Sequence, residues 1–318
     1  MKLCIAVPTF RRPQLLAAAL PAILSHLQEA VGARPGLQAG VLVVDNCPDG
    51  SAAGTVAGLA DPRVRYVNER VPGISAARNR ALDENADTDL LVFIDDDESP
   101  RERWLAALLQ TWEMTGAAAV MGRVESEFMA EPDPWVAAGT FFWRPRMPTG
   151  TRIEVAATGN LLLDLAQVRR SAVRFSADLG LTGGEDSLFS RELARTGASL
   201  VWCDESVATD FVPRERLQRP WLLKRSWSHG NAATLVELHL ATSAPGRGWV
   251  RVRAVGRGSA RVAAGLLRHA GGRLGGSLRH QARGLRTAHH GAGMLAGGLG
   301  HVYVEYARTD SPPATGTG

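Results

Sequence analysis

The sequence has few cysteines and no long apolar run. Cys4, Cys47 and Cys203 are the only three in 318 residues, too few and too scattered for a disulfide framework or a zinc site. No stretch approaches the roughly eighteen consecutive apolar residues of a transmembrane helix. The first apolar segment stops at Pro8, too early for a signal peptide. We therefore expect a protein that works in a reducing cytoplasm.

Acidic residues are nearly absent from 247–308, which contains eleven arginines and one acid, Glu305. This segment carries a charge of +10, so with a net charge of +4 for the chain the other residues carry −6. Leucines alternate with the arginines at helical spacing, and Gly271-Gly272 and Gly275-Gly276 are expected to break a long helix.

Three interpretations of this basic segment are open. It packs its leucines on the rest of the chain, it forms a homodimer, or it lies on an anionic membrane; the pattern slightly favours the first two. The third would place the protein peripherally at the inner face of the membrane. We expect no nucleic-acid binding, because no interleaved aromatic residues accompany the arginines.

Short apolar strands alternate with amphipathic helices through the first part of the chain. This pattern predicts an α/β fold with a mostly parallel, doubly wound sheet, in which ligands bind at the carboxyl ends of strands. The expected strands are 3–7, 41–44, 64–67, 90–94, 117–124, 161–163 and 200–203. The expected helices are 13–29, 75–85, 101–115, 185–196 and 221–239, with an irregular stretch at 132–148.

Four acids directly follow the most apolar strand, Leu90 to Ile94. Side chains two apart on an extended strand point the same way, so Asp95 and Asp97 can aim two carboxylates at one point. Mg²⁺ and Mn²⁺ prefer oxygen ligands of this kind. The alternative is a solvated acidic turn.

Three further motifs precede this one. Pro8-Thr9-Phe10-Arg11-Arg12 follows the first strand, Asp45-Asn46 ends the second, and Gly73-Ile74-Ser75-Ala76-Ala77-Arg78-Asn79 opens a helix. Together with Asp95-Asp96-Asp97, their order and spacing over 1–240 resemble the family-2 glycosyltransferases. The resemblance implies a Rossmann-like GT-A fold with a nucleotide-sugar-binding half at 1–125 and an acceptor half at 126–240. A basic helical extension at 241–308 and a disordered tail at 309–318 would follow.

The resemblance also implies roles for these residues. Contacts to a nucleotide-diphosphate sugar would come from Pro8, Thr9, Phe10, Arg12, Asp45, Gly73, Arg78, Asn79, Asp95 and Asp96. Mn²⁺ or Mg²⁺ would be held by Asp97 and Asp95, with His229 as a further ligand. Uridine is the favoured base.

Each role has a structural alternative. Asp45 would instead cap the turn that follows it, and Asn79 would hold its own loop. Arg78 would lie on the surface and pair with Glu84 or Asp87, and His229 would pack between helices.

A second constellation, Gly183-Gly184-Glu185-Asp186, opens a later helix. The positive end of a helix dipole favours carboxylates, and capping alone would explain one of these acids. By resemblance it corresponds to the family's E-D motif. We expect Asp186 to be the general base, since a carboxylate near the attacking hydroxyl is the required geometry, and Glu185 to hold the acceptor or the sugar.

The predicted function is a metal-dependent, inverting transfer from a nucleotide-diphosphate sugar to a hydroxyl or amine acceptor. A lipid-linked sugar, a small metabolite and a carrier-bound intermediate are open as acceptors, in polysaccharide, glycolipid or secondary-metabolite synthesis. One alternative is a nucleotidyltransferase, although the first strand lacks the glycine-rich phosphate loop expected there. Another is a non-catalytic nucleotide-sugar-binding protein, which would not need Glu185 and Asp186.

Overall fold

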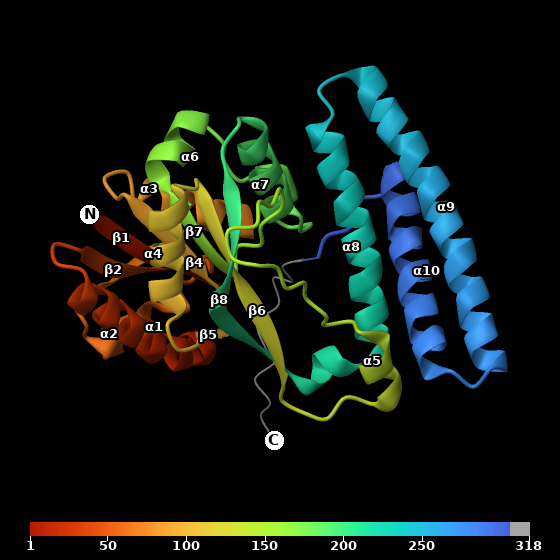
Figure 1. Cartoon of the computed structure of the whole chain (residues 1–318), viewed down its shortest axis with the longest axis horizontal. Coiled ribbons are helices and arrows are strands. Elements are labelled where there is room, and N and C mark those ends of the chain that lie inside the picture. Colours follow the sequence, from red (N-terminus) through yellow and green to blue (C-terminus); the bar gives the residue numbers. More distant parts are fainter. Residues whose placement is uncertain (306–318) are drawn as a thin grey trace.

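One sheet and a layer of long helices make up the protein in this computed structural model, which describes residues 1–305. Figure 1 shows the sheet with its flanking helices on one side and α8, α9 and α10 side by side on the other. The strands are β1 (Lys2–Thr9), β2 (Gln38–Asp45), β3 (Val64–Asn68), β4 (Leu90–Ile94), β5 (Glu98–Pro100), β6 (Ala119–Phe128), β7 (Asn160–Asp164) and β8 (Leu200–Val212). The predicted tail at 309–318 lies outside the described residues.

The strands form an eight-stranded sheet in the order β3-β2-β1-β4-β7-β6-β8-β5. The first four in this order run parallel to one another, and β6 and β8 are also parallel. β7 is antiparallel to both β4 and β6, and β5 is antiparallel to β8. The carboxyl ends of β1, β2 and β4 therefore meet at one edge of the sheet, where Thr9 pairs in register with Asp45.

Helices cover both faces of the sheet because their apolar side chains recur at helical spacing. One face packs against α1 and α4 through residues such as Leu20 and Leu108, and the other against α3, α6 and α7 through residues such as Leu82 and Phe189. The helices are α1 (Pro13–Ala33), α2 (Ala53–Leu59), α3 (Ile74–Asp83), α4 (Trp104–Thr115), α5 (Pro134–Gly139), α6 (Leu165–Ser171), α7 (Glu185–Arg195), α8 (Arg219–Leu240), α9 (Ala244–Leu274) and α10 (Leu278–Gly298), with 3-10 turns η1 (Ala177–Leu179) and η2 (Arg214–Leu217).

Among the described helices, only α1 is long and apolar enough to cross a membrane by length and composition. Its apolar side packs in the protein interior. Four of its residues are at most 1% exposed and belong to the core under the sheet: Leu16, Leu20, Ile23 and Leu27. Here α1 is a core helix.

Several elements differ from the sequence prediction: α2, β5 and α6 were not expected, and two further differences concern β8 and α5. β8 extends to Val212, nine residues beyond the predicted end at Cys203, because a register shift against β6 after Gly122 lets the strand continue past Asp204 and Glu205. The stretch predicted to be irregular contains α5, which begins because the Asp133 carboxylate accepts hydrogen bonds from the backbone N–H groups of Trp135 and Val136.

Glycines bring α9 and α10 unusually close together. A Cβ at Gly265 would lie 2.5 Å from the backbone nitrogen of Ala288, and one at Gly258 would lie 2.7 Å from the carbonyl oxygen of Gly291. A further seven-residue step places Gly272 on the same side of α9, against α10. The helices thus pack backbone to backbone.

Most leucines of the basic segment do not form this interface. Leu266, Leu267, Leu274 and Leu299 are between 50% and 92% exposed. The predicted packing of the segment on the rest of the chain is present, since α10 packs on both α8 and α9. The prediction that leucines provide it is confirmed only in part: Leu285 packs against the apolar cluster around Trp135 and Leu222, and Leu295 lies against Gly258. The helix break also falls only at Gly275-Gly276, because α9 continues through Gly271 and Gly272.

Candidate active site

The acidic motif forms a turn and does not continue the strand. β4 ends at Ile94, and the Glu98 backbone N–H donates to the Asp95 carbonyl at 3.2 Å, which closes the turn. The expectation that Asp95 and Asp97 align by strand alternation was therefore wrong in its geometry. The three aspartates instead have different partners.

Asp96 and Asp97 share one cation, Arg12. The Arg12 Nη1 donates to Asp97 Oδ2 at 2.9 Å and to Asp96 Oδ1 at 3.2 Å, and Thr9 Oγ1 donates to Asp96 Oδ2 at 2.7 Å. Arg216, from η2, adds a longer contact of 3.5 Å to Asp97 Oδ2. The motif at 8–12, whose first two residues end β1, therefore lies directly against the acidic turn, with Pro8 buried and Phe10 next to Thr9.

Asp95 interacts electrostatically with Arg78, which forms a buried ion pair with Glu185. Burial raises the pKa of its carboxyl to about 6, Arg78 opposes this, and Asp97, Asp96 and Asp186 reinforce it. Arg78 is 6% exposed and pairs with Glu185. Of the two interpretations of Arg78, the surface pairing with Glu84 or Asp87 was wrong.

The Arg78–Glu185 pair joins α3 to the first residue of α7, and its two residues are 107 apart in sequence. It draws the two predicted functional motifs into one site, since Asp95 and Asp186 both act electrostatically on Arg78. Burial raises the pKa of Glu185, and Arg78 opposes the shift. Glu185 is 5% exposed and bound to Arg78; its predicted contact with the acceptor or the sugar stays a prediction.

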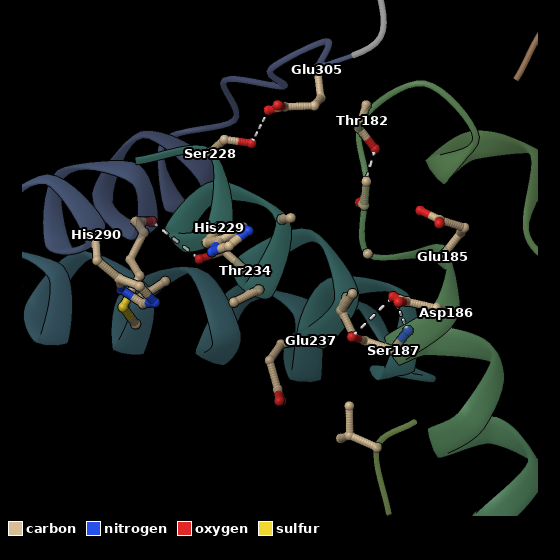
Figure 2. Close-up of a pocket in the computed structure, with 18 of the residues that line it drawn as sticks. Thr182, Glu185, Asp186, Ser187, Ser228, His229, Thr234, Glu237, His290 and Glu305 are labelled. Carbon is tan, nitrogen blue, oxygen red and sulfur yellow. Dashed lines mark hydrogen bonds between the residues drawn. The ribbon is translucent and has the colours of Figure 1, made fainter. Parts of the chain in front are cut away.

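Asp186 lines a cavity of about 600 Å³ between α7 and the helices α8, α9 and α10. Figure 2 shows Glu185 and Asp186 at the start of α7 on one side of the cavity and His229, on α8, on the other. The Asp186 Oδ1 accepts from the Ser187 backbone N–H at 2.6 Å. The first turn of α7 therefore orients this carboxylate beside the cavity.

The carboxylate of Asp45 is fully buried and holds the loop after β2. It accepts from the backbone N–H groups of Cys47 at 2.9 Å and Ala52 at 2.7 Å, and from the Tyr66 hydroxyl at 3.2 Å. This is the turn-capping alternative for Asp45. Base recognition by Asp45 stays a prediction.

Gly73 and Asn79 also have structural partners. The Gly73 N–H donates to Asn46 Oδ1 at 3.0 Å. Its φ is 115°, and a Cβ at this position would lie 3.0 Å from the Gly180 carbonyl oxygen, so the loop has room for glycine only. Asn79 donates to the Phe175 carbonyl at 2.8 Å and accepts from its N–H at 3.0 Å. The structure thus favours loop support over donor contact for Asn79.

His229 lies among positive charges. Burial lowers the pKa of its imidazole to about 3, and Arg225, His290, Arg286 and Arg144 lower it further. A cation is disfavoured in such surroundings. Within residues 1–305, no group of three or more His, Cys, Asp or Glu side chains is arranged to hold a metal ion, so the predicted ligand set with His229 is not assembled here.

The aspartates of the turn fit a divalent cation on chemical grounds. They provide carboxylate oxygens, the ligands that Mg²⁺ and Mn²⁺ prefer. Burial first, and the neighbouring aspartates after it, raise the pKa of Asp95, so its ionised form is disfavoured without a cation. A bound cation would stabilise that form. Asp95 and Asp97 would hold it.

The arginines that surround the site were not predicted from the sequence. Arg144 pairs with Asp210 at 2.9 Å, and Arg216 reaches Asp97. Their residue types were visible in the sequence, but only the extended β8 and the turn η2 bring them to the acidic turn. Glu98 was not predicted either. Burial is the main cause that raises the pKa of its carboxyl well above the usual range, and the charges of Asp95 and Asp97 raise it further.

Comparison with known proteins identifies both a family and a named relative. Residues 4–175 match the family model described as glycosyl transferase family 2. The chain is 33% identical over 229 residues to the succinoglycan biosynthesis protein ExoM of Rhizobium meliloti (strain 1021), an alignment that covers 71% of this chain and 72% of that protein.

Solved structures share the fold at low sequence identity. Residues 1–349 of S. aureus TarS, in complex with UDP-GlcNAc, superpose with a TM-score of 0.51 at 12% identity, covering 90% of this chain and 91% of that one. GalNAc-T7 with UDP, GalNAc and Mn²⁺ superposes with a TM-score of 0.53 at 11% identity, covering 74% of this chain and 51% of that one. At these identities the likeness concerns the fold, and it confirms the expected GT-A architecture.

Proposed function

The chain belongs to glycosyl transferase family 2, and we propose that it is a metal-dependent enzyme that transfers a sugar from a uridine-diphosphate sugar to a hydroxyl during polysaccharide synthesis. Family membership makes it a glycosyltransferase, which disfavours a nucleotidyltransferase and a non-catalytic binding protein. The relative of known name acts in succinoglycan biosynthesis, and a solved structure of the same fold holds UDP-GlcNAc. These findings support the polysaccharide context and the base.

The observation that carries the proposal is the buried Arg78–Glu185 pair. It couples the acidic turn after β4 to the start of α7, so that Asp95 and Asp186 act on one cation although they are distant in sequence. A displacement reaction needs a donor and an acceptor base in one site. The Arg78–Glu185 pair connects the acidic turn, where the donor would bind, to the start of α7, where the base would lie.

In the proposed reaction Asp186 takes the proton of the acceptor hydroxyl, whose oxygen attacks the anomeric carbon while the bond to the diphosphate breaks. Asp186 lines the cavity that an acceptor can enter, and its Oδ1 is held by the first turn of α7. A single displacement inverts the anomeric configuration. A divalent cation held by Asp95 and Asp97 would supply positive charge to the leaving diphosphate.

The test separates binding from chemistry. Asp186→Asn should retain binding of a UDP-sugar, measured by calorimetry. The rate at which UDP is released from that sugar, in a cell extract that contains the acceptor, should fall by about 10²–10⁴-fold, the usual contribution of general base catalysis. Asp178→Asn, an exposed acid near the same helix, is the matched control and should behave like wild type. Near wild-type turnover of Asp186→Asn would show that the base is misassigned.

A further inference from the structure

A second cavity, of about 940 Å³, adjoins the site and is lined mainly by cations and aromatic rings. Its aromatic wall is formed by Phe141, Phe142, Trp143 and Trp221. Its arginines are Arg144, Arg216, Arg225, Arg261, Arg268, Arg283 and Arg286. We call this cavity the arginine groove. Figure 1 shows the elements around it: α5 lies against one end of α8 and α10, with α9 beyond them.

The groove carries more positive charge than its surroundings balance. Asp210 is the one carboxylate among its lining residues. Asp97 and Glu305, from outside the groove, pair with Arg216 and Arg225, so three carboxylates stand against seven arginines. Within residues 1–305, no salt bridge connects the arginines that α9 and α10 contribute to any carboxylate. Like charges gathered in this way repel, and a bound anion would relieve the cost.

The arginines of α10 are built into the groove. Arg283 and Arg286 are three residues apart and therefore lie on one face of the helix. The Arg286 Nη1 donates to the Thr140 carbonyl at 2.8 Å, which fixes its guanidinium, while the Arg283 Nε is buried without a hydrogen-bond partner. Arg261 approaches His290 from α9, with 3.4 Å between Nη1 and Nδ1. Planar guanidinium groups held in this way match the oxygens of phosphate.

The groove is continuous with the cavity that contains Asp186. Arg225, His229, Arg261 and His290 line both cavities. A molecule whose hydroxyl lies at Asp186 can therefore extend into the groove. The aspartates of the acidic turn, which would bind the donor, line neither cavity, although Arg216 of the groove contacts Asp97. We assign the groove to the acceptor because it is continuous with the cavity at Asp186.

We propose that the arginine groove binds a phosphate or diphosphate group of the acceptor, with the aromatic wall contacting the sugar or apolar chain next to that group. This inference rests on the proposed function, because it assigns the groove to the acceptor of that reaction. Arg261, Arg283 and Arg286 are the anion ligands. The acceptor class is thus a phosphorylated or lipid-diphosphate-linked saccharide.

The experiment is calorimetric titration of the full chain with inorganic diphosphate in EDTA, so that no divalent cation carries the probe to the acidic turn. Arg283→Gln with Arg286→Gln should weaken binding by about tenfold or more, since charge-assisted hydrogen bonds are among the strong ones. Arg273→Gln with Arg279→Gln removes the same charge from exposed positions of α9 and α10 outside the groove, and should change the affinity by less than about twofold.

Arg283→Gln alone provides a second test, because it leaves the Arg286–Thr140 hydrogen bond intact; it should still weaken binding severalfold. Equal affinity of the groove variants and wild type, or no binding to wild type, would overturn the proposal. Farnesyl diphosphate distinguishes the sources of the anion. If farnesyl diphosphate binds more tightly than inorganic diphosphate, and Trp143→Ala removes this difference, the anion is carried by a lipid. If the two probes bind with equal affinity, the acceptor is a phosphorylated saccharide without lipid.

The same variants separate this proposal from the proposed function. Binding of UDP with Mn²⁺ should be unchanged in Arg283→Gln with Arg286→Gln, because the acidic turn is untouched. If wild type binds diphosphate in the groove but no nucleotide, the glycosyltransferase mechanism fails while the groove stands. If it binds nucleotide but no diphosphate, the groove fails alone.

Discussion

The sheet and the layer of helices α8, α9 and α10 are held together by different means. The sheet buries large aliphatic side chains, such as Leu20 and Val92, between helices and strands. In the second region, glycines such as Gly265 allow the backbones of α9 and α10 to touch. Their charges differ as well: the turn at the sheet edge contains three aspartates, and the helices line the groove with arginines. The comparison shows that the candidate active site lies where two differently built regions meet.

The largest expected effect comes from breaking the ion pair within the sheet region. Glu185→Leu should lower the free energy of unfolding by about 3–5 kcal/mol, because it leaves the Arg78 guanidinium buried without its partner. Arg78→Met combined with Glu185→Leu should lose less than the sum of the two single variants. Urea unfolding of the four proteins in a double-mutant cycle measures this, and additive losses would show that the pair is not coupled.

A smaller effect is expected in the helical region. Gly265→Ala should lower the free energy of unfolding by about 1–3 kcal/mol, since a Cβ there lies 2.5 Å from the backbone of α10. Gly256→Ala on the same helix is the control: a Cβ there meets nothing within 4 Å, and alanine should add about 0.5–1 kcal/mol. Thermal unfolding compares the two, and equal shifts would refute close helix packing.

The acidic turn should make stability depend on pH. The folded-state pKa of Asp95, about 6, lies above its ordinary value, so the folded state binds the proton more tightly and stability falls as pH rises from about 4 to 6. In EDTA at pH 8, Asp95→Asn should therefore be more stable than wild type by about 1–2 kcal/mol. The gain should vanish near pH 4. A gain at pH 4 as large as at pH 8, or the same gain in the exposed control Asp87→Asn, would contradict this.

The sheet region was largely predictable because its signals are local. Buried strands ending in acids indicated an α/β fold. The motifs at 8–12, 45–46 and 95–97 lie at the ends of β1, β2 and β4, and the motif at 73–79 opens α3. Asp186 likewise lies at a helix start, as expected. The cytoplasmic location stays a prediction.

The rest depended on tertiary contacts. The pairing of Arg78 with Glu185 joins segments that no local pattern relates, and the turn at Asp95 replaced the assumed strand geometry. In the basic segment, leucines suggested the packed face, but glycines at seven-residue spacing form it. That spacing was visible in the sequence and could have been used. The sequence does not reveal which arginines face the groove, because this depends on how three helices meet.

The most direct test of the account is the melting temperature of wild type and Asp97→Ala with UDP, in Mn²⁺ or in EDTA. A ligand that binds only the folded state raises the melting temperature. We predict a rise for wild type with UDP and Mn²⁺ together, a loss of that rise in EDTA, and none in Asp97→Ala under any condition. No rise in wild type with UDP and Mn²⁺, or an equal rise in Asp97→Ala, would contradict a metal-dependent donor site at the acidic turn.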